Sequence, residues 1–369
     1  MDWWKKKNNK SPRAVLQRQR LVRERERGEI LLQETIQCCD GKSNPIKCFS
    51  ADEILEATDT FSESNRVSQL YDDFPFDWYS GKQKDNNNDH HHTILIKKWR
   101  YRLNDHNRGN FCRDIAMSSM VSGHKNFLKL MGCSLESENP VLVYHAVEKK
   151  PTSLDLKTVV SWRERLKIAE DIAIALAYLH TAFPRPFVYR IMRLGDILLD
   201  ENGAAKLSNF SHCVSIPLGE TFVKLGFRCV GGDYDYMDDD YLLNGVVSEK
   251  TDVFSFGVFM QKLLTGEERF RELNGRRTEW LGSYNMNVPR CWSNTIGEFS
   301  IYAVVDPHLL EKMGRVSEEE HCQMKAFLVL AERCIGLGGE VPKMVEVAKE
   351  LKRFIKNASS PSYSTEIHM

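Results

Sequence analysis

The stretch VYRIMRLGDILLD, residues 188–200, carries charged side chains that include Arg190, Asp196 and Asp200, while Ile191 fills a central position. Isoleucine can neither accept a proton nor orient a hydroxyl group. Mg²⁺ is a hard cation that prefers carboxylates, so Asp196 is a weak candidate for a metal ligand. These residue types predict weak metal binding at most, and no acid–base chemistry at position 191.

The composition is that of a globular protein with one large domain or two lobes. The 369 residues include 51 Lys and Arg and 51 Asp and Glu, so the net charge indicates no class of partner. The ten cysteines form no CxxC pair, which favours reduced thiols in the cytosol over a disulfide framework or a zinc site. No apolar run approaches the roughly 18 residues of a membrane span.

Positive charge is concentrated at the N-terminus, where residues 1–27 contain ten Lys and Arg but only three Asp and Glu. Ser11 and Pro12 could begin a basic helix, but the apolar residues lose the helical period between Arg23 and Glu29. We therefore expect a solvated or adaptable arm, which could bind anionic lipid, nucleic acid or a protein, or remain disordered. Lipid is favoured among these ligands because many cations lie close together.

Residues near the N-terminus determine whether a lipid could be attached to the chain. Asp2 excludes N-myristoylation, and no apolar stretch follows the first charges, so we expect no secretory signal. Palmitoylation of Cys38 or Cys39 is left open.

The stretch CFSADEILEATDTF marks the start of the folded domain. Ser50 and Glu53 form a capping box, and Phe49 with Ile54 supplies a hydrophobic staple. A short helix is predicted to begin there.

Strand-like patterns with one helix follow up to residue 145, and helical patterns dominate from Trp162. The tract KQKDNNNDHHH between two strands is predicted to be a solvated hairpin tip rather than a metal site. This order predicts an α+β fold with a small strand-rich lobe, a larger helical lobe and a cleft between them. The predicted boundaries are 1–47 for a basic extension, 48–355 for the domain (small lobe 48–145, large lobe 146–355) and 356–369 for a flexible tail.

The domain as a whole resembles a plant receptor-like kinase domain over about residues 48–355. The resemblance rests on segments that occur in one order: FSADEILEATDTF, TILIKKW, LMGCSLESENPVLVYHAV, WRERLKIAEDIAIALAYLH, ILLDENGAAKLSNF, VSEKTDVFSFGVFMQKLLTG and VVDPHLL. The chain is most similar to the cytoplasmic branch that resembles wall-associated kinases, and within it to the ZED-related pseudokinases, which act as adaptors in plant immunity. The resemblance implies a bilobal protein-kinase-like fold.

Kinases of this family hold the phosphates of ATP with a glycine-rich loop and with a lysine that pairs with a glutamate on a helix. Lys97 matches the lysine, and Asp114 stands at the place of the glutamate, one methylene shorter. The resemblance puts Tyr71, Asp73 and Phe76 where the three glycines belong, and Asp73 presents the wrong charge to a phosphate. Lys97 is thus the candidate nucleotide-binding residue, with Asp114 as its ion-pair partner.

The catalytic positions of the family are also altered. Tyr189 replaces the usual His, Ile191 replaces the catalytic Asp, and Asp196 replaces a metal-binding Asn. Asn209 replaces the magnesium-binding Asp, and Ser211 the Gly that follows it. Together these changes remove the base, the metal ligands and the phosphate cradle. We therefore predict a catalytically inactive protein, since phosphoryl transfer depends on positioning and electrostatics.

Nucleotide binding without turnover is an alternative. Leu95 replaces the small Ala that leaves room for adenine, and Phe74 or Phe76 could enter the pocket. The pair of Lys97 and Asp114 could equally be a structural salt bridge. We expect no required cofactor, with ATP as an optional ligand.

The activation segment of the family corresponds to residues 209–241. The ion pair that anchors it is replaced by Asp240 and Val341, so we expect a loosely tethered segment that becomes ordered when a partner binds. Asp252 is kept, and in the family this residue braces the catalytic loop through backbone hydrogen bonds. The stretch GGDYDYMDDDY is either a solvated acidic loop or a partner surface formed by Tyr234, Tyr236, Asp238, Asp239 and Asp240.

The resemblance implies an interaction protein. It would be an adaptor or scaffold that links a coiled-coil, leucine-rich-repeat immune receptor to cytoplasmic kinases or to the pathogen effectors that modify them. The alternatives are a weak atypical Ser/Thr kinase that uses Asp196, and an ATP-binding sensor without turnover. We expect protein partners, no nucleic acid partner, and a cytoplasmic location that could be peripheral at the plasma membrane through residues 1–27.

Overall fold

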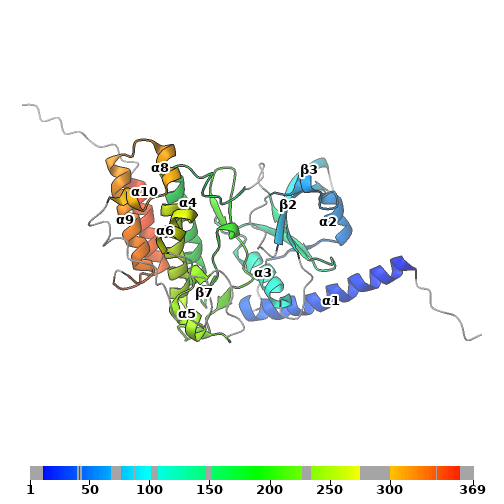
Figure 1. Ribbon diagram of the computed structural model, residues 1–369. Coiled ribbons are helices and arrows are strands. Elements are labelled where there is room, and N and C mark those ends of the chain that lie inside the picture. The colour runs from blue at the N-terminus through cyan, green and yellow to red at the C-terminus, as the bar shows by residue number, and fades with distance from the viewer. Residues whose placement is uncertain are drawn as a thin grey trace, which may run out of the picture. The chain divides into compact units, whose positions relative to one another are not determined.

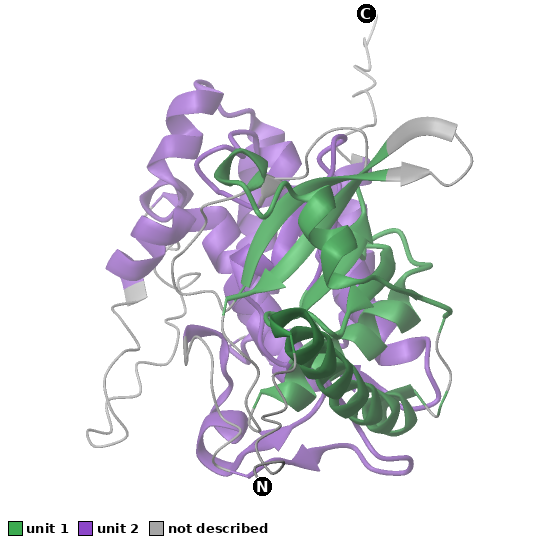
Figure 2. Ribbon diagram, turned by 90° about the vertical axis from the view of Figure 1, so that its right-hand side faces the viewer, with its two compact units in different colours: residues 1–151, 209–211 green, residues 152–208, 212–369 purple. Residues whose placement is uncertain are grey.

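The computed structural model describes most of the chain, as two compact units. The described residues are 11–39, 41, 44–67, 76–85, 88–100, 107–146, 152–226, 234–274, 300–337 and 339–357. The first unit comprises residues 1–151 together with 209–211, and the second comprises residues 152–208 and 212–369 (Figure 2). The positions predicted for Tyr71, Asp73 and Phe74, and the tail after Asn357, lie outside the described residues.

A five-stranded sheet forms the centre of the first unit, in the order β1-β4-β5-β3-β2. The long antiparallel pair of β2 (Phe76–Asp85) and β3 (Asn88–Trp99) is joined by β5 (Val141–His145), β4 (Leu130–Ser134) and the parallel β1 (Lys47–Cys48). Alternate apolar side chains of these strands face α2, and together they form one buried cluster.

Helix α2 (Ala51–Ala57) begins as its sequence predicts. The Ser50 side chain accepts a hydrogen bond from the backbone N–H of Glu53, and the Glu53 side chain accepts one from the backbone N–H of Ser50. Phe49 and Ile54 are both buried in the cluster over the sheet. The predicted capping box and staple are therefore confirmed, and they fix where the folded domain begins.

The second half of helix α1 (Pro12–Cys39) corrects the prediction of a solvated or adaptable arm, because the helix packs on α3 (Arg108–Val121) and its buried residues begin at Arg27 (Figure 1). Residues 12–26 are mostly exposed, as predicted. Arg27 in the middle of α1 is buried, and its guanidinium donates to three backbone carbonyl oxygens of residues 135–138 at 2.5 to 3.1 Å. Burial lowers the pKa of Arg27 to about 10. The side of α1 that packs is polar and charged, and for this reason the apolar residues do not identify the buried face of the helix.

The C-terminal end of α1 is held against α3 by further contacts. Glu34 forms an ion pair with Arg113 of α3, with 2.9 Å between Oε2 and Nε. Cys38 and Cys39 are buried, and the Cys39 thiol donates to the carbonyl oxygen of Ala116. Burial raises the pKa of Cys38 to about 11. Neither thiol is accessible for palmitoylation in this arrangement.

The second unit is mainly helical. Its helix α4 (Trp162–Thr181) begins with a capping box of Ser161 and Glu164, and its apolar face, predicted from the sequence, is buried. The further helices are α5 (Asp239–Asn244), α6 (Glu249–Asn274), α8 (Pro307–Met313), α9 (Glu318–Cys334) and α10 (Met344–Asn357). Helix α10 packs on α4, and α9 packs on α6 (Figure 1). None of the described helices is long and apolar enough to span a membrane.

Short strands complete the second unit. They are β6 (Thr152–Ser153), β8 (Ile197–Leu199) and β9 (Ala205–Leu207) in one sheet, β7 (Phe187–Val188) paired with β10 (Val214–Ser215), and β11 (Val223–Lys224) paired with β12 (Val246–Val247). The strands β10 and β11 belong to the segment that was predicted to be loosely tethered. That prediction is wrong for this part of the segment, because backbone hydrogen bonds hold it at both strands.

The close approach of β1 and β4 requires a glycine at position 132. A Cβ added to Gly132 would overlap the backbone carbonyl oxygen of Lys47. We expect Gly132→Ala to lower the free energy of unfolding by about 1–3 kcal/mol. The matched control is Gly28→Ala in α1, where a Cβ would meet nothing within 4 Å. It should raise the stability by about 0.5–1 kcal/mol through helix propensity. Urea unfolding followed by circular dichroism checks both, and equal midpoints would contradict the packing described here.

Candidate functional site

The candidate nucleotide-binding residue Lys97 is completely enclosed within the first unit. It lies on β3 and is 0% exposed. Its Nζ lies 2.6 Å from Oδ2 of Asp114 on α3 and 3.1 Å from Oδ1 of Asn209. The Phe76 ring covers the same ammonium group, with its centroid at 4.1 Å. The predicted ion pair of Lys97 and Asp114 is confirmed, and the ammonium group is already surrounded by a carboxylate, an amide oxygen and an aromatic face.

Residues 209–211 close this cluster. The backbone N–H of Phe210 donates to Oδ1 of Asp114 at 2.7 Å. The Ser211 hydroxyl donates to Oδ1 of Asn209, also at 2.7 Å. Asn209 has a φ of 65°, a left-handed conformation that asparagine tolerates better than most residues. The amide oxygen of Asn209 therefore serves as an acceptor for both Lys97 and Ser211.

The segment that carries the altered catalytic positions is braced inside the second unit by Asp252. Its Oδ2 accepts the backbone N–H of Tyr189, and its Oδ1 accepts that of Arg190, both at 2.8 Å. Nε2 of His180 lies 2.8 Å from the same Oδ2. Asp252 is fully buried and Arg190 has a φ of 76°, so these hydrogen bonds hold an unusual backbone conformation in place.

Apolar packing replaces acid–base chemistry in that segment. Ile191 and Met192 are 5% and 0% exposed, and their burial can contribute about 1.5–3 kcal/mol each. Asp196, the predicted weak metal candidate, is also fully buried. Among the described residues, one group of three ligand-type side chains lies within 4.8 Å of one another, and it is on α9: Glu318, His321 and Cys322. Asp196 is not part of it.

The predicted acidic partner surface is only partly present. The Tyr234 side chain lies outside the described residues. Tyr236 is buried beneath Lys262, whose Nζ lies 4.3 Å from the ring centroid. Asp238 is the N-cap of α5, and burial raises the pKa of its carboxyl. Asp239 and Asp240 are exposed. Tyr236 and Asp238 must therefore be removed from the proposed surface, because packing and helix capping occupy them.

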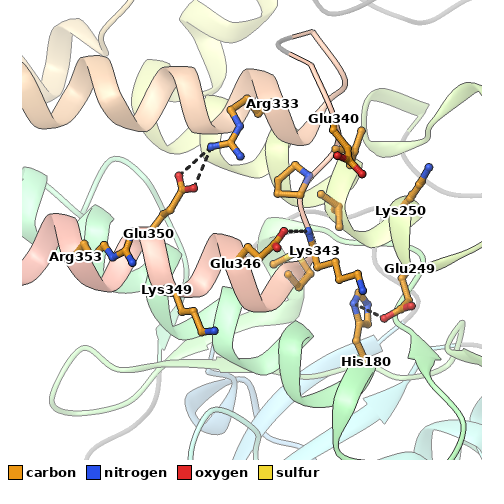
Figure 3. Close-up of a pocket in the computed structure, with 14 residues that line it drawn as sticks. His180, Glu249, Lys250, Arg333, Glu340, Lys343, Glu346, Lys349, Glu350 and Arg353 are labelled. Atoms are coloured by element: carbon orange, nitrogen blue, oxygen red, sulfur yellow. Dashed lines mark hydrogen bonds and ion pairs between the residues drawn. The ribbon is translucent and has the colours of Figure 1, made fainter.

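A hollow of about 600 Å³ lies in the second unit, between the N-terminal ends of α6 and α10 (Figure 3). Val341, which stands at the position of the family's anchoring Arg, lines it. Charges of both signs surround it, including the ion pair of Arg333 and Glu350 and the contact of His180 with Glu249. This mixture of charges selects no single class of ligand.

Sequence reasoning missed an apolar stripe along α1. Val15, Leu21, Val22, Leu32 and Ile36 are all exposed, at 43 to 62% of their surface. At 100° per residue they fall on the side opposite buried Arg27 and Glu34. The available signal was the spacing of Val15, Val22 and Ile36, which are 7 and 14 residues apart and therefore lie on nearly the same side of a helix.

Comparison with known proteins agrees with the fold and the altered site. The family model "Protein tyrosine and serine/threonine kinase" matches residues 77–299, more than half of the chain. The chain belongs to this protein kinase family. A protein described as "Non-functional pseudokinase ZRK15" from Arabidopsis thaliana is 67% identical over 368 residues, which cover 100% of both chains. "Non-functional pseudokinase ZED1" from the same plant is 42% identical over 337 residues, 88% of this chain and 94% of that protein.

The solved structures include a similar fold. The pseudokinase domain of BIR2, described as an immune regulator of the RLK/Pelle family, matches with a TM-score of 0.55 and 18% identity. The match covers 84% of this chain and 87% of that domain. The predicted ZED-related family and the α+β, bilobal kinase-like fold are thereby confirmed. The protein is a pseudokinase rather than an enzyme, in agreement with Ile191 and Asn209 at the positions of the two lost carboxylates.

The buried ion pair makes the pseudokinase sensitive to the loss of either partner. In Asp114→Ala the ammonium group of Lys97 and the N–H of Phe210 both lose an acceptor. We expect the free energy of unfolding to fall by about 3–5 kcal/mol. The control is Asp52→Ala, which breaks the exposed ion pair with Arg20 and should cost less than about 1 kcal/mol. Urea unfolding compares the two, and similar losses would show that the buried pair is not structural.

Proposed function

We propose that this pseudokinase is an adaptor or scaffold in plant immune signalling. It would link a coiled-coil, leucine-rich-repeat immune receptor to cytoplasmic kinases or to pathogen effectors. Similarity to ZRK15 and ZED1 along nearly the whole chain supports the assignment to this family of inactive kinases. The observation that carries the adaptor role is the apolar stripe on α1, because an adaptor needs a surface for a partner.

The stripe is unusual for the surface of a folded protein. Of the eleven exposed large apolar side chains among the described residues, six belong to α1 alone. Exposed large apolar side chains gathered on one helix face are typical of an interaction site, and here the ion pair of Arg25 and Glu29 lies among them. The opposite face of α1 is held by Arg27, Glu34 and the buried thiols, so the stripe is presented on a fixed helix. A preorganised surface loses little conformational entropy on binding.

Charges of both signs accompany the stripe. Arg13 and Arg18 are exposed, and Arg25 is exposed and paired with Glu29 at 3.2 Å. Such charges at an interface mainly raise the association rate and the specificity. We assign this surface to the immune receptor. The proposal also places the protein in the cytoplasm, with the same arginines available to an anionic membrane surface.

Introducing a negative charge into the stripe tests the receptor contact. Leu32→Glu and Val22→Glu should each weaken binding of the co-purified coiled-coil, leucine-rich-repeat receptor by at least about tenfold, because each buries a carboxylate in an apolar interface. Val329→Glu on α9 is the matched control, since Val329 is 48% exposed and lies in the second unit. Binding is measured by surface plasmon resonance.

Two outcomes would contradict the receptor contact. One is unchanged receptor affinity in both α1 variants. The other is loss of binding to anionic vesicles in these variants while the receptor still binds, which would assign the stripe to a membrane.

The enclosed Lys97 leads us to propose that no nucleotide is required. A phosphate could reach its Nζ only by displacing Phe76 or Asn209, and Asp114 already neutralises the charge. Mg-ATP should therefore leave the melting temperature of the protein unchanged. The double variant Ile191→Asp, Asn209→Asp should also show no phosphoryl transfer, because these substitutions do not make Nζ of Lys97 accessible to a phosphate.

Two measurements check this, namely differential scanning fluorimetry and a radiolabelled phosphate assay. Autophosphorylation by the unaltered chain would favour the atypical kinase, and a rise in melting temperature with Mg-ATP would favour the nucleotide sensor.

A further inference from the structure

A second cavity lies in the first unit, between α1, α2 and residues 136–139. Its volume is about 360 Å³, within the range of roughly 300–1,000 Å³ that is typical of small-molecule sites. Ile54, Leu55 and Phe61 form an apolar wall. Leu16 of α1 also lines the cavity and remains 46% exposed, although it lies on the side of α1 that faces the unit. The cavity is therefore apolar and accessible from solvent.

Lys98 brings a positive charge to this cavity. Its Nζ lies 3.9 Å from the ring centroid of Phe61 and 5.7 Å from that of Tyr79. It forms no ion pair with any described residue, in contrast to its neighbour Lys97. Burial lowers the pKa of Lys98, and the charges of Asp77 and Glu63 oppose this effect without cancelling it.

The other charged side chains around the cavity have hydrogen-bond partners or lie at its rim. Arg20 forms a bidentate ion pair with Asp52, with both N–O distances at 2.9 Å. Nε of Arg23 donates to the backbone carbonyl of Glu136, and the Glu136 carboxylate accepts the backbone N–H of Ala51. Glu138 is exposed at the rim. Lys98 is the cation that lies against the aromatic wall, where it could meet the negative charge of a ligand.

A strained turn holds Phe61 against Lys98. Asp59, Thr60 and Phe61 have φ values of 49°, 56° and 59°, three consecutive non-glycine residues in the left-handed region. Each costs roughly 1–2 kcal/mol, so the surrounding contacts must impose the conformation. Thr58 provides such contacts, since its hydroxyl donates to the carbonyl of Ile54 and accepts the N–H of Phe61. The aromatic wall and the cation are therefore preorganised.

We propose that this cavity binds an amphipathic organic anion, with its apolar body against Leu16, Leu55 and Phe61 and its carboxylate or sulfonate at the ammonium group of Lys98. The geometry selects for both parts of such a ligand. The apolar wall favours burial of a hydrocarbon, and the ammonium group of Lys98 against that wall favours a negative charge over a neutral or cationic group. This site is independent of the adaptor role, because it involves neither the outward stripe of α1 nor the Lys97 cluster.

The test compares three ligands of equal length on the full chain: octanoate, 1-octanol and octylammonium. The ¹³C-labelled methyl groups of Ile54 and Leu55 report binding by NMR. We expect octanoate to shift these signals with an affinity at least about tenfold higher than that of 1-octanol, and octylammonium to bind more weakly than either. Lys98→Met should abolish the preference for octanoate, whereas Lys98→Arg should keep it.

Two further variants make the result decisive. Lys82→Met removes an exposed lysine of β2 that does not line the cavity, and it should change nothing. Leu16→Trp should fill the cavity from an exposed position and weaken both octanoate and 1-octanol. The proposal is overturned if octanoate and 1-octanol bind equally, if neither shifts the methyl signals up to its solubility limit, or if Lys98→Met keeps the preference. Melting curves establish that each variant is folded.

Discussion

Lys97 places a buried ammonium group at the centre of the first unit. If this group had no partners, its burial would cost more free energy than the total stability of an ordinary protein. Three groups meet this constraint: the carboxylate of Asp114, the amide oxygen of Asn209 and the ring of Phe76. The constraint fixes α3 against the sheet through Asp114. It also explains why residues 209–211 belong to the first unit although the chain around them belongs to the second. An Asn at 209 is sufficient here, because the cluster needs an acceptor and not a metal ligand.

A buried polar group also requires a partner within the second unit. Asp252 must be kept there because its carboxylate is the acceptor for the backbone N–H groups of Tyr189 and Arg190. The side chain at position 191 is not needed as an acceptor for any such backbone group of the fold. Once no proton has to be moved there, an apolar side chain can be buried and adds stability. The residues that the fold needs and those that the reaction needs are therefore separable. This chain keeps Asp252 for its fold, and Lys97, whose counterpart in kinases holds phosphates, is part of a buried cluster instead.

Features governed by local rules could be predicted from the sequence. The capping box at Ser50 follows from residue types three positions apart, and the lobes follow from the change of hydrophobic period. The resemblance to kinases added the partner of Lys97. The burial of Tyr236 could not be predicted, because it depends on Lys262 of α6, which lies in a different part of the sequence. Nor could the cavity at Lys98, which α1 and residues 136–139 create by tertiary packing.

Helix α1 shows the limit of periodicity arguments most clearly. Hydrophobic patterns predict the buried face only where burial is apolar, and here the buried face has to satisfy the carbonyl oxygens of residues 135–138. Arginine meets that need, so the polar side of α1 faces inward and its apolar side faces outward. Outward apolar side chains gain nothing in the isolated chain, since water remains in contact with them. The adaptor role that we propose would account for their arrangement on a helix fixed by Arg27 and Glu34, because such a surface becomes buried when a partner binds.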